Sequence, residues 1–558
     1  MPAGAGTGAG SGAGSAKAAG AGRDPARRPG PTRAADPRRT AYDVLAAVRD
    51  REAYANLLLP KLLAERQLTG RDAAFATELA YGTLRGQGSY DAVIAACSDR
   101  PLGKLDPPVL DVLRLGTHQL LSTRVGAHAA VATSVDLARS VSGPRVSGYV
   151  NAVLRRVATR DLGAWLDIVA PDPAADPDGA LAVRYSHPRW IVGAYRAALG
   201  DAAARPFAGA AHGEDEDAAG GELAAGRVVA GENVAGQEAA GENVAGQVVA
   251  GQIVAGEGNP AGQAPAAGPP LTELAAALAA GNARPRVTLA TFPAGAPRDE
   301  VMPAGARPGR WSPYAFTLAS GDPAPLINAG TAAVQDEGSQ LAAIALAGVP
   351  LAGQPDGASE RWLDLCAGPG GKARLLYGLA AVQGANLTAA ELHPHRAALV
   401  EAALTRAAES IAAAPPFEVM VADSTTAPWP DGSFDRVLAD VPCTGLGALR
   451  RRPEARWRKS PADLDGLAAL QRDLLRSALA AVRPGGVVGY VTCSPVPAET
   501  TEVVAAVTAS VPGAEVLDAP ALLPSVPAAA AADPRFVQLW PHRQGTDAIF
   551  IALLRRTG

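Results

Sequence analysis

Five apolar runs in the C-terminal half of the chain each end at a loop that carries a polar or reactive side chain, and this succession limits the fold more than any other feature. The runs cover residues 361–365, 386–390, 417–421, 434–439 and 487–491. Short apolar runs separated by helical stretches are typical of buried parallel strands. The sequence therefore predicts a Rossmann-like α/β domain, in which ligands bind in a crevice at the carboxyl ends of the strands.

The loop after the first run is rich in glycine and leads into a predicted helix. Residues 367–371 read Ala-Gly-Pro-Gly-Gly, and the helix is expected to begin at Lys372. Glycine lets a backbone approach a ligand closely, and a helix N-terminus offers unpaired N–H groups to an anion. The loop lacks the G-x-G-x-x-G order of dinucleotide sites, which disfavours an NAD-dependent oxidoreductase without excluding it.

Carboxylates follow the next three runs. Glu391 stands about twenty residues past the glycine loop, where a carboxylate commonly accepts ribose hydroxyls. Asp423 could reach an adenine amino group, and Asp440 ends the fourth run. Any one of them could instead cap a helix or lie in a solvated turn. Their common position at strand ends favours one shared ligand site.

Two of the four cysteines occupy matching contexts at strand ends. Cys443 lies in the segment Asp-Val-Pro-Cys and Cys493 in the segment Thr-Cys-Ser-Pro, which places both thiols on turns. A thiolate that adds to C6 of a cytosine makes C5 able to attack a sulfonium methyl group, and a second cysteine could assist release. The hypothesis is therefore methyl transfer from S-adenosylmethionine to a pyrimidine. Cys97 and Cys366 are expected to be inert small side chains.

The N-terminal half shows helical periodicity from about residue 39 to 160. Val109, Leu113, Gly116 and Leu120 fall on one stripe of a helix, and prolines and glycines punctuate the segment. This pattern predicts a bundle of several helices. His187 follows in a connector that leads into a helix over 191–199, and we expect packing to hold it, with a catalytic role as the alternative.

Two stretches have too few large apolar residues to build a core. Residues 1–36 are rich in Gly, Ala, Pro and Arg, and residues 208–270 repeat an Ala-Gly step every five residues. Both are expected to be disordered. Weak RNA contact by the basic tail and a solenoid formed by the repeats are the alternatives.

Charge and cysteine content restrict the partners and the compartment. A formal net charge of −4 means that any basic surface must be local, and residues 450–459 form such a basic run around Trp457. We interpret this run as an RNA contact, with arginines on phosphates and the indole on a base; a solvated face is the alternative. Four cysteines suit a reducing cytoplasm, and neither a membrane span nor a metal site is expected.

From residue 271 to the C-terminus the motifs closely resemble the bacterial Sun/Fmu (RsmB-type) RNA cytosine-5 methyltransferases. The two cysteine segments are similar to the Pro-Cys and Thr-Cys motifs of that family, and alanine is commoner there at the position of Gly368. The resemblance implies that Cys493 is the nucleophile and Cys443 the release cysteine. It also implies S-adenosylmethionine contacts at Cys366, Ala367, Gly368, Pro369, Gly370, Gly371, Lys372, Glu391, Asp423 and Asp440.

Residues 39–160 resemble the RNA-binding NusB fold, through 128–132 and 149–155. A NusB-like bundle ahead of such a catalytic domain implies methylation of cytosine C5 in 16S rRNA by a cytoplasmic monomer. The alternative is a non-catalytic NusB-like RNA-binding factor with a degenerate methyltransferase domain, which the intact cysteines argue against. The expected organisation is a tail (1–36), NusB-like domain (37–165), connector (166–207), repeat insertion (208–270), N-terminal catalytic subdomain (271–345) and methyltransferase domain (346–558).

Overall fold

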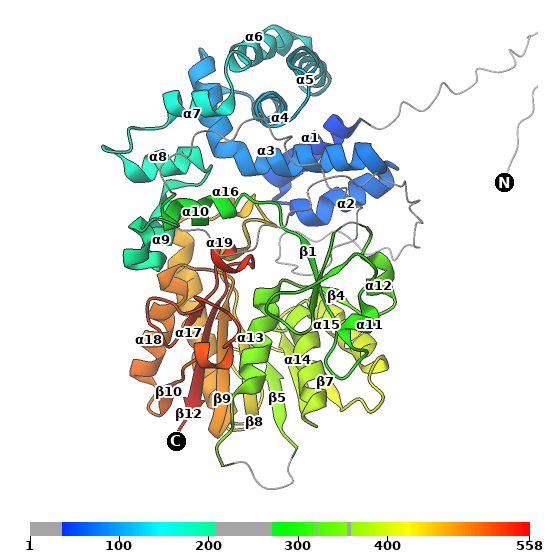
Figure 1. Cartoon of the computed structure of the whole chain (residues 1–558), viewed down its shortest axis with the longest axis vertical. Helices are drawn as coiled ribbons and strands as arrows, with labels where there is room; N and C mark the ends of the chain where they lie inside the picture. The colour runs from blue at the N-terminus through cyan, green and yellow to red at the C-terminus, as the bar shows by residue number, and fades with distance from the viewer. Residues whose placement is uncertain (1–35, 208–270, 320, 354–358) are drawn as a thin grey trace, which may run out of the picture. The chain divides into compact units, whose positions relative to one another are not determined.

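A mixed sheet of eight strands lies at the centre of the C-terminal half in the part of the chain that the structure, a computed structural model, describes: residues 36–207, 271–319, 321–353 and 359–558 (Figure 1). Five strands run parallel in the order β7, β6, β5, β8, β9. They are β5 (Arg361–Asp364), β6 (Asn386–Glu391), β7 (Phe417–Val421), β8 (Phe434–Asp440) and β9 (Val482–Thr492).

Each of the five parallel strands coincides with one of the apolar runs, so the predicted Rossmann-like α/β class is confirmed. The sheet continues beyond β9 with antiparallel β12 (Phe550–Arg556), which separates β9 from β10 (Ala514–Val516) and also pairs with β11 (Val537–Gln538). This antiparallel edge is absent from the expectations drawn from the sequence.

Helices cover both faces of this sheet. One face packs against α13 (Glu337–Gly348), α14 (Gly371–Val382) and α15 (Pro394–Glu409), and the other against α17 (Ala462–Ala481) and α18 (Thr501–Ser510). Successive residues of β12 alternate between the two cores, because side chains of a strand point to opposite faces in turn. Ile551 and Leu553 join the first core, whereas Ala552 and Leu554 join the second.

A second, smaller sheet precedes the large one. Its antiparallel order is β2 (Arg307–Pro308), β3 (Ala315–Leu318), β1 (Val287–Ala290) and β4 (Ala333–Val334). Leu289, Phe316 and Ala332 form its core, and the short helices α11 (Arg298–Val301) and α12 (Ala324–Asn328) lie in its connections. The chain then enters α13, which packs on the large sheet.

The N-terminal half is helical, as predicted. Leu113 and Gly116 of the predicted stripe are buried in α4, and Leu120 is half-buried. The bundle helices are α1 (Pro37–Arg51), α2 (Ala55–Glu65), α3 (Gly70–Cys97), α4 (Pro107–Ser122), α5 (Ala127–Ser142) and α6 (Ser147–Val157). None of the helices among the described residues has the length and apolar character to cross a membrane.

A connector of short helices follows: α7 (Leu162–Val169), α8 (Pro177–Arg184), α9 (Arg189–Leu199) and, past the repeats, α10 (Glu273–Ala280). His187 is buried there with its Nδ1 2.6 Å from Tyr185 O, as expected for a histidine held by packing. The predicted tail, apart from Asp36, and the repeat insertion lie outside the described residues. The positions that flank the insertion meet, since Phe207 N donates to Leu271 O at 2.7 Å.

Residues 450–459, called the docking segment below, join the bundle and connector to the catalytic half; they include α16 (Ala455–Arg458). Arg456 is fully buried and donates to Ser186 O at 2.8 Å and to Asn282 Oδ1 at 2.6 Å. The buried Glu454 accepts from Ala55 N at 3.1 Å, at the start of α2.

Further contacts extend this interface. The Tyr54 ring lies near the guanidinium groups of Arg452 and Arg458, at 5.5 and 5.0 Å, and Trp457 packs against Gly88 of α3. The prediction that this basic run serves as an RNA contact is therefore wrong for Arg456, whose guanidinium is buried in hydrogen bonds within the chain. Trp457 is half-buried, so its predicted contact with a base stays a prediction.

Candidate active site

The glycine loop connects β5 to α14. Gly370 has φ +105°, and a Cβ at this position would lie 3.0 Å from the Cβ of Ala403, so both the backbone angle and the space favour glycine. The next residue, Gly371, opens α14, and a Cβ there would meet nothing within 4 Å. The first N–H groups of a helix have no partner within it. The open space ahead of α14 therefore suits an anionic group.

Glu391 braces this loop from the end of β6. Its carboxylate is only 4% exposed and accepts from Gly368 N at 3.1 Å and His393 N at 3.0 Å. Arg396 donates to Gly368 O at 2.7 Å and lies 3.4 Å from the same carboxylate. A Cβ on Gly368 would come within 2.0 Å of Glu391 Oε2. Glycine in place of the commoner alanine thus lets the carboxylate approach the loop.

Apolar and acidic side chains lie at the strand ends beside Glu391. Leu392 and Val421 are each 55% exposed, at the ends of the neighbouring strands β6 and β7. Asp423 lies just beyond β7, exposed, and hydrogen bonds from Thr425 lower the pKa of its carboxyl group. Exposed apolar side chains beside carboxylates suit a ligand that has both a flat ring and polar edges.

Lys372 and Asp440 form an ion pair, with Nζ 2.8 Å from Oδ2. Burial alone would lower the pKa of Lys372, but the charge and hydrogen bond of Asp440 outweigh it and raise the pKa. The lysine comes from the first turn of α14 and the aspartate ends β8. This pair therefore holds the ammonium group of Lys372 between the glycine loop and the cysteines.

Asp364, the last residue of β5, is a site residue that the sequence interpretation missed. It is fully buried, and its oxygens accept no hydrogen bond of normal geometry from the described residues. Burial, followed by the charge of Asp440, raises its pKa to about 8. A carboxylate inside an apolar run and directly ahead of a glycine loop was the signal available in the sequence.

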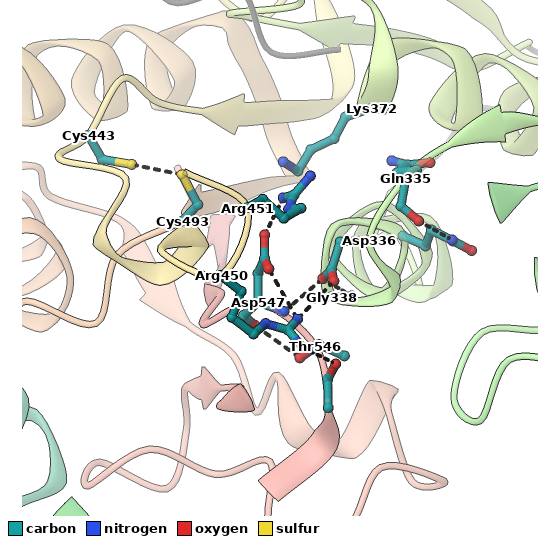
Figure 2. Close-up of polar contacts among 12 residues, drawn as sticks. Gln335, Asp336, Gly338, Lys372, Cys443, Arg450, Arg451, Cys493, Thr546 and Asp547 are labelled. Carbon is teal, nitrogen blue, oxygen red and sulfur yellow. Dashed lines mark hydrogen bonds and ion pairs between the residues drawn. The ribbon is translucent and has the colours of Figure 1, made fainter. Parts of the chain in front are cut away.

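The two cysteines lie at the ends of adjacent parallel strands, β8 and β9, with their sulfur atoms 3.3 Å apart (Figure 2). Hydrogen bonding to Cys493 and burial raise the pKa of Cys443 well above its ordinary value. The same hydrogen bond lowers the pKa of Cys493, which is the more exposed thiol. These opposite directions favour Cys443 as the donor of the hydrogen bond and Cys493 as the thiol that ionises first.

An ion network, buried except for Arg451, is drawn beside the cysteines in Figure 2. Arg450 lies 3.1 Å from Asp547 and 3.4 Å from Asp336, and Arg451 also pairs with Asp547. Asp336 further accepts from Gly338 N at 2.9 Å and thereby caps α13. Burial raises the pKa of Asp336 to about 6, while the two arginines outweigh burial and lower that of Asp547. The network connects the docking segment to α13 and to the loop before β12.

The predicted site residues thus fall into two groups on either side of β5. Lys372 and Asp440 lie with the cysteines: the charge of Asp440 raises the pKa of Cys493 and that of Lys372 lowers it. Glu391 and Asp423 lie at the ends of β6 and β7, on the other side. Burial raises the pKa of both remaining cysteines, Cys97 in α3 and Cys366 in the glycine loop.

Comparison with known proteins gives matches along the whole described chain. The family model described as 16S rRNA methyltransferase RsmB/F matches residues 352–555, and the NusB family model matches residues 35–159. A Mycobacterium tuberculosis protein that is named a methyltransferase, with no substrate in the name, is 45% identical over 538 residues, which is 96% of this chain and 98% of the relative.

Two further comparisons extend these matches. Ribosomal RNA small subunit methyltransferase B of Pseudomonas putida is 29% identical over 495 residues, covering 87% of this chain and 91% of the relative. The crystal structure of PH0851 is similar with a TM-score of 0.63 at 19% identity, covering 93% of this chain and 98% of that one. At that identity the structural likeness supports the fold, a helical region followed by a mixed-sheet domain.

Proposed function

The chain belongs to the RsmB/F family of 16S rRNA methyltransferases, and from this premise we propose that it methylates C5 of a cytosine through a covalent bond to Cys493. The family establishes the coarser activity, which is S-adenosylmethionine-dependent methylation of ribosomal RNA. The choice of cytosine C5, the small-subunit RNA as substrate and the roles of individual residues are parts of the proposal.

S-adenosylmethionine supplies an electrophilic methyl group on a sulfonium centre. The residues at these strand ends fit this molecule, because the open N-terminus of α14 and Lys372 could receive its carboxylate. Glu391 would accept the ribose hydroxyls and Asp423 the adenine amino group, with Leu392 and Val421 against the ring. The loop residues 366–371 would follow the ligand with their backbone.

The thiol pair is the observation that carries the cytosine proposal. C5 of cytosine is a poor nucleophile until a thiolate adds at C6, and the lowered pKa of Cys493 favours it over Cys443 as that thiolate. The Cys493 sulfur would bond to C6, and C5 would then take the methyl group. After a base removes the C5 proton, the C6–S bond breaks and its electron pair returns to Cys493.

Cys443 would assist this last step. Its thiol lies 3.3 Å from the Cys493 sulfur and its raised pKa favours the protonated form, so it could donate its proton to the sulfur that departs. Asp440 and Lys372, which lie between the glycine loop and the thiols, would orient the reactants. The helical bundle at 35–159 would contribute RNA binding, which its NusB family match supports.

Two cysteine substitutions test the proposal. Cys493→Ala should abolish methyl transfer and leave cofactor affinity unchanged, because the thiol acts on the base. Cys443→Ala should trap a protein–RNA adduct that survives denaturant, and the adduct should vanish in the double variant. Cys97→Ala, which changes a buried cysteine of α3, is the matched control and should behave as wild type. Wild-type turnover by Cys493→Ala would refute the covalent route.

A further inference from the structure

A single buried carboxylate joins the two turns that carry the cysteines. Glu499 is completely buried, six residues past Cys493. Its Oε1 accepts from the backbone N–H of Thr444 at 2.7 Å, and its Oε2 accepts from the Thr444 hydroxyl at 2.5 Å and the Ser494 hydroxyl at 2.6 Å. Thr444 directly follows Cys443 and Ser494 directly follows Cys493. Glu499 therefore bridges the residues adjacent to both thiols.

Neighbouring side chains lock this carboxylate in place. Gln471 of α17 donates to Glu499 Oε1 at 3.2 Å and to Pro442 O, on the other side of Cys443, at 2.8 Å. Tyr490 of β9 donates to the backbone oxygen of Glu499 at 2.8 Å. With so many donors directed at it, the carboxylate cannot swing away without leaving buried N–H and O–H groups unpaired. The hydrogen bonds of Glu499 thus hold the two cysteine turns at a fixed separation.

The charge of Glu499 also differentiates the two thiols. Its negative charge is among the causes that raise the pKa of Cys443, and it is not among the main influences on Cys493. The hydrogen bond from Cys443 lowers the pKa of Cys493, and Lys372 and Arg452 also lower it, against burial and the charge of Asp440, which raise it. Two chemically identical thiols therefore have different charged neighbours, which is an arrangement that can separate an acid from a nucleophile.

We propose that Glu499 is a positioning residue that holds Cys443 within reach of Cys493 and keeps the proton of the pair on Cys443. The role of Glu499 in methyl transfer rests on the function proposed above. Its effect on the position and protonation of the two thiols does not depend on that function. Glu499 touches neither sulfur and acts only through Thr444, Ser494 and its charge.

The test measures the thiols of the full chain without RNA or cofactor. Diamide oxidises a close pair of thiols to a disulfide, and its rate depends on thiolate content and proximity. In Glu499→Gln, disulfide formation between Cys443 and Cys493 should slow about tenfold, because the amide nitrogen cannot accept hydrogen bonds and the two turns are no longer held together, although the thiolate content of Cys443 rises. With limiting iodoacetamide, the share of label on Cys443 relative to Cys493 should rise several-fold. Glu502→Gln, an exposed carboxylate in the first turn of α18, is the control and should match wild type.

A second variant separates position from charge. Ser494→Ala removes one hydrogen bond to Glu499 and keeps its charge, so disulfide formation should slow while the distribution of label between the two thiols stays that of wild type. It also decides the positioning half of the proposal if Glu499→Gln fails to fold. Wild-type disulfide rates in either folded variant, or an unchanged label distribution in folded Glu499→Gln, would overturn the inference.

Turnover connects the inference to catalysis. With rRNA as substrate, Glu499→Gln should lower kcat with little change in the KM for S-adenosylmethionine, since Lys372 and Asp440 remain paired. If Glu499→Gln changes the disulfide rate and the label distribution but leaves kcat unchanged, Glu499 positions the thiols without contributing to catalysis. If Cys443→Ala traps no adduct while Glu499→Gln still alters the thiols, only the function proposed above fails.

Discussion

At the residue scale, the strand-end positions of the candidate site could be predicted, whereas the environment of each side chain could not. Glu391, Asp440 and the two cysteines follow apolar runs, a pattern visible in one dimension. The burial of the Asp364 carboxylate without a hydrogen-bond donor depends on which side chains surround it in space. The bridge made by Glu499 depends on a turn 55 residues away, at Thr444. Such contacts are set by tertiary packing and have no local signature.

The buried Asp364 should make stability depend on pH. Its pKa is about 8 in the folded chain against an ordinary 3.8, so the folded state keeps a proton that the unfolded state loses as the pH rises. Stability from this group is therefore full below about pH 4 and falls as the pH rises toward 8. Asp364→Asn, which cannot ionise, should lose less stability over this window in urea titrations. Equal losses in variant and wild type would show that Asp364 is ionised throughout.

Glu391 should govern cofactor affinity. Glu391→Ala removes the acceptor proposed for the ribose and releases the N–H groups of Gly368 and His393, so binding should weaken by about 1–3 kcal/mol. Calorimetry with S-adenosylmethionine measures this directly. Glu401→Ala, on the exposed side of α15, is a control that should bind as wild type. Unchanged affinity in Glu391→Ala would remove Glu391 from the site.

At the scale of elements, periodicity predicted the five parallel strands and the helical half, because long regular patterns are read reliably from sequence. The small sheet was missed because β2 and β4 contribute only two residues each. Arg456 was misinterpreted because a basic run has the same composition whether it faces solvent or packs against another element. The partners of the docking segment, Ala55, Ser186 and Asn282, lie far away in sequence.

Gly88 of α3 should be required for this docking. A Cβ there would lie 2.6 Å from the Trp457 ring and 3.4 Å from Ser186 Cα. Gly88→Ala should therefore lower the free energy of unfolding by about 1–3 kcal/mol through overpacking, although alanine favours the helix. Gly148→Ala, in α6 with nothing within 4 Å of the added Cβ, should not destabilise. Urea unfolding compares the two, and equal stabilisation by both would contradict the described interface.

At the scale of the whole molecule, residues 36–558 form one compact unit, and the positions on either side of the repeat insertion meet within it. Phe207 bonds to Leu271, and Pro206 pairs with Thr272. A short Gly/Ser linker in place of 208–270 therefore has little distance to span, and loop-closure entropy changes only as the logarithm of length. Thermal unfolding and methylation of naked rRNA should stay close to wild type. A shortened chain that fails to fold would show that the repeats contribute structure.

The central claim is that Cys493 directs methylation to C5 of a cytosine in small-subunit RNA. The direct measurement incubates unmodified 16S rRNA with the purified chain and S-adenosylmethionine labelled in the methyl group, then identifies the labelled nucleoside by mass spectrometry. The label should appear in 5-methylcytidine, and none should appear with Cys493→Ala. Label in N4-methylcytidine or in another nucleoside, or 5-methylcytidine formed without Cys493, would contradict the account.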